Sequence, residues 1–107
     1  MSEQAVIVHF DYGQTDLSQL FELEDQLIAA IDAAGVGEFD GNEVATDGSD
    51  GDLYMYGPDA DKLFEAIRPV LESATCIHQT VATVRYGPPE DGVRERKVAI
   101  GFVQLFG

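Results

Sequence analysis

The spacing of the hydrophobic residues changes once in the first third of the chain, from a strand-like period to a helical period. Within residues 5–12, Val6, Val8 and Phe10 alternate with other side chains, and β-branched and aromatic residues are frequent. This pattern predicts a strand with one face in the core. Across residues 17–34 the apolar side chains recur at steps of three and four, which predicts an amphipathic helix. The chain is therefore expected to form a mixed domain of strands and helices.

The predicted helix at 17–34 has end signals. Asp16 is expected to cap its first turn, with Gln19 three residues further on. Gly35 is expected to close the helix in the left-handed backbone conformation.

Turn-rich and apolar segments alternate in the rest of the chain. Pro58 opens a second predicted helix that runs to Ala74, and Pro69 inside it is expected to kink or shorten it. The other predicted strands are residues 42–46, 52–56, 79–86 and 93–102. The first two flank a turn rich in Asp and Gly at 47–51, and the last two flank a turn rich in Gly and Pro at 87–92.

This order of elements is β-α-β-β-α-β with an extra C-terminal strand, in one α+β domain at residues 1–107. It favours a ferredoxin-like sandwich with two helices on one face of an antiparallel sheet. The right-handed crossover rule places the first strand between the third and the fourth. The extra strand is expected to extend the sheet beyond the fourth strand.

The chain is strongly acidic, because twenty Asp and Glu face six Lys and Arg and give a formal net charge of −14. Nucleic-acid phosphates and anionic lipids repel such a charge, so charge-driven binding to nucleic acid or to a membrane is not expected. A basic protein or a metal cation is attracted by it. The alternative is that the acidity serves solubility alone.

The predicted contacts to a basic partner are acidic side chains on the two helices. They are Glu22, Asp25, Asp32, Asp61, Glu65 and Glu72. We expect these carboxylates to steer a basic surface onto the helical layer.

The two acidic helices, at 17–34 and 58–74, and the hairpin at 47–52 resemble the layout of the ribonuclease E regulator B family, and of other small acidic ferredoxin-like proteins of unknown function. The regulator family acts by binding its enzyme, so the resemblance implies a non-catalytic regulator. The chain lacks that family's long acidic tails, and the resemblance implies no site residues.

A metal site is a second hypothesis, built on His9, Cys76 and His78. Cys76 and His78 lie two residues apart, so a strand would direct both to one face, and an antiparallel first strand would bring His9 close with Asp11 nearby. Imidazole and thiol ligands suit zinc or copper. The alternative is that Cys76 is a small buried apolar residue.

The basic residues concentrate near the C-terminal end of the chain. Arg85, Arg94, Arg96 and Lys97 are a candidate contact patch for an anion or a partner. In a strand, Arg94 and Arg96 point to one face and Lys97 to the other, which splits the patch. The alternative is that these charges protect an edge strand from pairing with another sheet.

The C-terminal residues 102–107 are apolar and include Phe102, Leu105 and Phe106. Exposure of these side chains to water is costly, so we expect a homodimer through the open sheet face or through this segment. The N-terminus lacks the basic region of a signal peptide, and the longest apolar run, 98–103, is far too short to span a membrane. We therefore expect a cytoplasmic protein.

No catalytic motif is present, and the Asp- and Gly-rich turn does not match a calcium-binding loop, because its fifth and sixth positions are Gly51 and Asp52. No cofactor is expected. The sequence thus favours a non-catalytic regulator or inhibitor of a basic partner. The alternative is a small-molecule or metal-binding domain, possibly an enzyme, that uses His9, Cys76 and His78.

Overall fold

A computed structural model describes residues 3–101, which form an α+β domain of five strands and two helices. The elements in chain order are β1 (Gln4–Asp11), α1 (Ser18–Ala34), β2 (Glu38–Val44), β3 (Asp50–Gly57), α2 (Ala60–Ser73), β4 (His78–Arg85) and β5 (Glu95–Ile100). All strand pairs are antiparallel, and the strand order in the sheet is β2-β3-β1-β4-β5. The arrangement is consistent with the ferredoxin-like sandwich that the sequence predicts.

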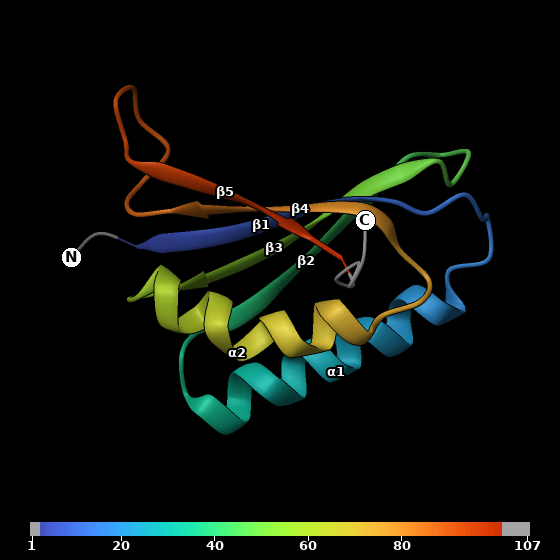
Figure 1. Cartoon of the computed structure of the whole chain (residues 1–107), viewed down its shortest axis with the longest axis horizontal. Helices are drawn as coiled ribbons and strands as arrows, with labels where there is room; N and C mark the ends of the chain where they lie inside the picture. Colours follow the sequence, from blue (N-terminus) through green and yellow to red (C-terminus); the bar gives the residue numbers. More distant parts are fainter. Residues whose placement is uncertain (1–2, 102–107) are drawn as a thin grey trace, which may run out of the picture.

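The two helices lie side by side against one face of the sheet, which leaves the opposite face uncovered by helices (Figure 1). β1 lies between β3 and β4, and β5 extends the sheet beyond β4, as the sequence predicts. We call the face turned away from the helices the open sheet face. Neither helix within residues 3–101 is long and apolar enough to cross a lipid bilayer.

The core lies between the sheet and the helices. Val6, Val8 and Phe10 of β1 are fully buried, whereas His9 between them is exposed. The helices contribute buried side chains at helical spacing, which are Leu20, Leu23, Leu27 and Ile31 of α1 and Leu63, Phe64, Ile67 and Leu71 of α2. Each fully buried side chain of this size stabilises the fold by about 1.5–3 kcal/mol.

The turn between β2 and β3 packs tightly on the segment that follows β1. Gly48 has a φ of +74°, and its backbone oxygen accepts hydrogen bonds from the amides of Gly13 and Gln14. A Cβ at Gly48 would collide with the backbone oxygen of Gln14, so glycine is required there. This contact fixes the start of β3, where Asp50 and Asp52 lie.

The observed bounds differ from the predicted ones by one or two residues at most strand ends, and by more at the start of β2. β2 begins at Glu38, four residues before the predicted start, because Glu38 and Phe39 pair with Tyr56 and Met55 of β3. Asp40 and Gly41, which strands disfavour, hide this extension in the sequence. The cap of α1 also differs, because Leu17 occupies the cap position and Asp16 accepts a hydrogen bond from the Ser18 amide instead.

The second helix begins at Ala60 rather than Pro58, where the Asp59 side chain accepts a hydrogen bond from the Lys62 amide. α2 continues past Pro69 to Ser73, so the proline does not end it. Burial of Ile67 and Leu71 on either side of Pro69 outweighs the missing backbone donor.

Candidate functional site

The outer surface of α1 carries a line of alternating apolar and acidic side chains. Phe21, Asp25, Ile28 and Asp32 follow one another at steps of four, three and four, so they fall within about 60° of the helix circumference. We call these four residues the α1 stripe. Phe21 is 50% exposed and Ile28 39% exposed, and they are the large apolar side chains that stand exposed within residues 3–101.

The charge of α1 is entirely negative. The helix contains four acids and neither Lys nor Arg. Within the described part of the chain, Glu22, Asp25 and Asp32 form no ion pair with another side chain. Glu24 is half-buried and accepts a hydrogen bond from Asn42 of β2, and its burial raises the pKa of its carboxyl group. The α1 stripe therefore presents apolar surface within a field of uncompensated negative charge.

The predicted acids of α2 are engaged differently. The Arg68 guanidinium donates to Glu72 at 3.0 Å, one helical turn away. Asp61 accepts hydrogen bonds from the Tyr86 hydroxyl at 2.6 Å and from Arg96 at 3.2 Å. The bond from Tyr86 is the main reason why the pKa of Asp61 is held below its ordinary value. Glu65 is exposed and forms no ion pair within residues 3–101.

The four predicted basic residues lie near one end of the molecule, where Arg94 and Arg96 both contact Tyr86. Arg96 lies over the Phe64 ring and contacts Asp61 on the helical side of the sheet, whereas Lys97 donates to the Thr83 hydroxyl. Arg94 lies over the ring of Tyr86, and Arg85 donates to the backbone oxygen of Gly87.

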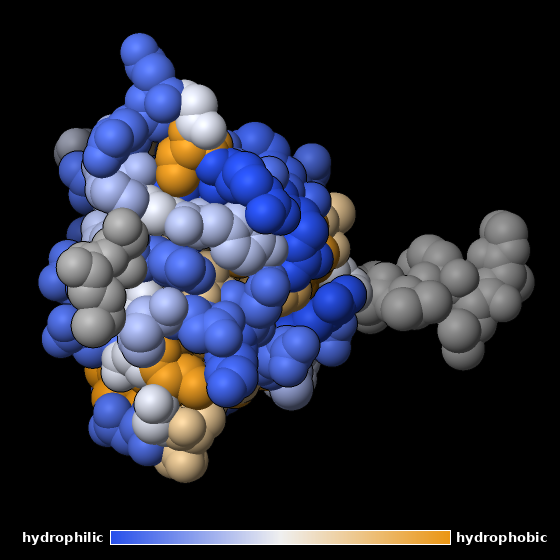
Figure 2. Space-filling view, turned by 90° about the vertical axis from the view of Figure 1, so that its left-hand side faces the viewer, coloured by the Kyte–Doolittle hydropathy of each residue, from blue (hydrophilic) through white to orange (hydrophobic). Residues whose placement is uncertain are grey.

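Figure 2 shows this end of the molecule, which is largely hydrophilic with small, separate hydrophobic areas. Among the predicted basic residues, Arg94 and Arg96 come together at Tyr86, whereas Arg85 and Lys97 bond to other groups.

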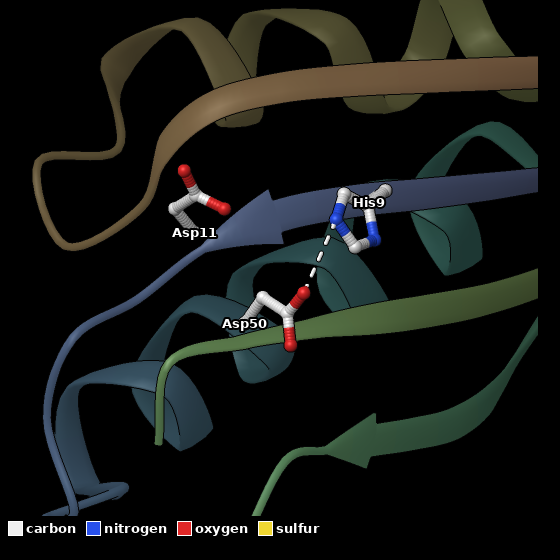
Figure 3. Close-up of side chains that lie close together, drawn as sticks. All are labelled: His9, Asp11 and Asp50. Atoms are coloured by element: carbon white, nitrogen blue, oxygen red, sulfur yellow. Dashed lines mark ion pairs between the residues drawn. The ribbon is translucent and has the colours of Figure 1, made fainter. Parts of the chain in front are cut away.

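On the open sheet face, His9 is the centre of an acidic group. Its Nδ1 atom lies 3.0 Å from Asp52 Oδ1, and its Nε2 atom lies 3.6 Å from Asp50 Oδ2. The pairing of β1 with β3 causes this, because His9 lies opposite Asp52 and Asp11 opposite Asp50. His9, Asp11 and Asp50 each offer one ligand atom within 4.8 Å of the others (Figure 3).

The structure divides the predicted metal-binding residues between two places. Cys76 lies in a shallow pocket between the two helices, where its thiol donates to the backbone oxygen of Gln19 at 3.8 Å, and desolvation raises the thiol pKa. His78 is the exposed first residue of β4 and lies opposite Asp11. Within residues 3–101, the side chains close enough together to hold one metal ion are His9, Asp11 and Asp50, without Cys76 or His78.

Sequence reasoning missed Asp50, although a signal for it exists. Asp50 and Asp52 occur at strand spacing directly after the hairpin turn, so both point to the same face of β3. The register that places them beside His9 depends on the length of that turn.

A second acidic contact on the open sheet face lies nearer the edge. The Tyr54 hydroxyl donates to Glu43 Oε1 at 2.7 Å. This bond, with smaller contributions from burial and from the charge of Asp52, raises the pKa of Tyr54 to about 12.

Comparison with known proteins adds no family assignment, since no protein-family model and no curated sequence matches the chain. The candidate sites therefore rest on the geometry of this chain.

Proposed function

We propose that this ferredoxin-like protein is a non-catalytic regulator or inhibitor that binds a basic partner protein through α1. The observation that carries the proposal is the exposure of Phe21 and Ile28 on a helix whose charged residues are all acidic. An exposed apolar patch rimmed by polar side chains is typical of a surface that binds another protein.

The charge around the α1 stripe supports a basic occupant. Asp25 and Asp32 alternate with the apolar side chains, and Glu22 adds a third carboxylate on the side that faces α2. A partner that presents Lys or Arg around an apolar contact would bury Phe21 and Ile28 and offset these charges. A second copy of the chain would bring the same carboxylates together, so charge disfavours self-association through this surface.

The sequence predicts six acidic residues as contacts to the partner. They differ in whether they form ion pairs within the chain, and this orders them as candidates. We propose Glu22, Asp25 and Asp32 as the main steering charges, because none forms an ion pair within the described residues. Asp61 and Glu72 have arginine partners in the chain, so their charges are partly neutralised. Glu65, on the neighbouring helix, forms no such pair with any residue that the structure describes.

The expected homodimer stays a prediction. Residues 102–107, one of its two expected contacts, lie outside the described residues. The other expected contact, the open sheet face, carries Asp50 and Asp52, which would repel their counterparts in a second copy.

The proposal is tested by capturing the tagged protein from lysate of its source cells at low and high salt. We compare the natural chain with the double variant Phe21→Ser/Ile28→Ser, and use Phe21→Leu/Ile28→Leu as the control that keeps the surface apolar. We expect a basic partner in stoichiometric amount that high salt releases, that the serine variant loses and that the leucine variant keeps. Equal capture by the serine and natural chains would show that the α1 stripe is not the contact.

A further inference from the structure

The open sheet face holds a second possible site, separate from the α1 stripe. Three side chains from two neighbouring strands, His9 and Asp11 of β1 and Asp50 of β3, bring one nitrogen and two carboxylate oxygens within 4.8 Å of one another. Figure 3 shows the two carboxylates on the same side of the imidazole ring. One imidazole and two carboxylates form a donor set that suits a divalent first-row transition metal.

The spacing of the donors is close to what a metal requires. Metal–ligand bonds of about 2.1 Å in a tetrahedral site place neighbouring donors roughly 3.4 Å apart. His9 Nε2 and Asp50 Oδ2 are already 3.6 Å apart. The His9 and Asp50 side chains are about half exposed, so small side-chain rotations can close the remaining distances without disturbing the core.

Asp52 fixes the orientation of the imidazole from outside the donor set. Its carboxylate lies 3.0 Å from Nδ1 of His9. When Nδ1 carries the proton and donates to Asp52, the lone pair on Nε2 is available on the side of Asp50. A carboxylate in this position is the usual support for a metal-binding histidine, because it sets both the tautomer and the ring direction.

The local charge favours a cation at the same place. Asp11, Asp50 and Asp52 surround one imidazole, and within residues 3–101 none of the three is paired with Lys or Arg. A divalent ion would offset most of this negative charge. A bound arginine or lysine side chain carries a single positive charge and would offset less of it.

We propose that His9, Asp11 and Asp50 bind a divalent transition-metal ion, with Zn²⁺ as the representative, and that Asp52 positions His9. Water fills the remaining coordination position of this three-ligand site. The site differs from the one expected from the sequence, because Cys76 and His78 are not among its ligands. It also does not depend on the proposed partner of α1, which contacts the other side of the molecule.

The test is a calorimetric titration of the tag-free protein with Zn²⁺. We compare the natural chain with His9→Gln, Asp11→Asn and Asp50→Asn. His78→Gln is the first control, because it removes the other imidazole of the chain, and Asp40→Asn is the second, because it removes one exposed carboxylate elsewhere on the sheet. Circular dichroism checks that each variant is folded.

We expect one Zn²⁺ per chain, at least a tenfold loss of affinity for each of the three ligand variants, and a change of less than about twofold for both controls. In the same titration followed by NMR, the ring signals of His9 should shift with bound zinc. The proposal is overturned if His9→Gln binds zinc as tightly as the natural chain. It is also overturned if His78→Gln or Asp40→Asn weakens binding as much as Asp50→Asn.

Discussion

The outer surface of α1 and the open sheet face are both acidic and exposed, but their carboxylates are arranged in different ways. On α1, Asp25 and Asp32 alternate with Phe21 and Ile28 and form no ion pair in the described part of the chain. On the sheet, Asp50 and Asp52 converge on the imidazole of His9. Helical spacing separates carboxylates along a line, whereas strand pairing brings them together from two segments.

This difference shows that net charge alone does not define a binding function. Carboxylates spread among apolar side chains favour the binding of a large basic surface. Carboxylates that surround an imidazole nitrogen favour the binding of a small cation. The geometry of the backbone decides between the two.

The largest expected effect is on stability, and it distinguishes a buried from an exposed side chain of α1. Leu27 is fully buried and Ile28, its neighbour, is 39% exposed. We expect Leu27→Ala to lower the free energy of unfolding by about 2–5 kcal/mol, and Ile28→Ala to lower it by less than about 1 kcal/mol. Denaturant unfolding followed by circular dichroism measures both.

A large loss of stability in Ile28→Ala would mean that Ile28 serves the core. It would then no longer support a surface kept for a partner. The matched pair therefore tests the interpretation of the exposed apolar residues before any partner is known.

The second effect concerns the charges of the α1 stripe. Once a partner has been captured, Asp25→Asn/Asp32→Asn should weaken its binding about three- to tenfold in low salt, and far less in 0.5 M salt. Glu43→Gln on the open sheet face is the matched control and should leave the affinity unchanged. Calorimetry or surface plasmon resonance at the two salt concentrations measures this. An equal loss for the control would show that only the total charge matters.

A smaller effect distinguishes paired from unpaired acids. Asp61→Asn should lower the free energy of unfolding by less than about 1 kcal/mol at neutral pH, because its bonds to Tyr86 and Arg96 are exposed to solvent. Since the pKa of Asp61 is lowered in the folded state, its contribution is present above the unfolded pKa and is lost as the pH falls.

Asp32→Asn on α1 should cost no stability, because Asp32 has no such pair within the described residues. Unfolding curves at pH 7 and at acidic pH compare the two variants. A greater loss for Asp32→Asn than for Asp61→Asn would contradict the division between paired and unpaired acids.

The smallest expected effect is a change in the pKa of one tyrosine on the open sheet face. The pKa of Tyr54 is raised to about 12, chiefly because its hydroxyl donates to Glu43. Its contribution to stability is therefore complete below the ordinary tyrosine value and is lost as the pH rises toward 12. Burial also raises the pKa of Tyr12, so ultraviolet absorbance should show at least two tyrosines fewer ionising near pH 10 than the four in the chain. Glu43→Gln should return Tyr54 alone toward its ordinary pKa. No difference between the two chains would mean that the hydrogen bond does not form in solution.

Much of the fold could be predicted from the sequence, because it is encoded locally. The alternation about Val8 and the helical spacing of Leu20, Leu27 and Ile31 specify which faces are buried. The bounds of β2 could not be predicted, because Glu38 and Phe39 join a strand only through their pairing with β3.

The candidate sites were less predictable than the fold. They depend on the register between neighbouring strands and on the way the helices pack in the tertiary structure. His9 was a candidate in the sequence, but its neighbours Asp50 and Asp52 follow from the pairing of β1 with β3. Cys76 was expected beside His9, and the structure places it against α1, since it precedes β4 rather than belonging to it. The acids of the helices were identified, but which of them have arginine partners required the tertiary structure.

The most direct test of the account is site-specific photo-crosslinking from the two acidic faces. A photoreactive amino acid replaces Ile28 on the α1 stripe in one chain and Glu43 on the open sheet face in another, and both are irradiated in lysate of the source cells. The account predicts that position 28 crosslinks one basic protein, that high salt abolishes the product, and that position 43 does not yield it. The same product from position 43, or none from position 28, would contradict a partner-binding surface on α1.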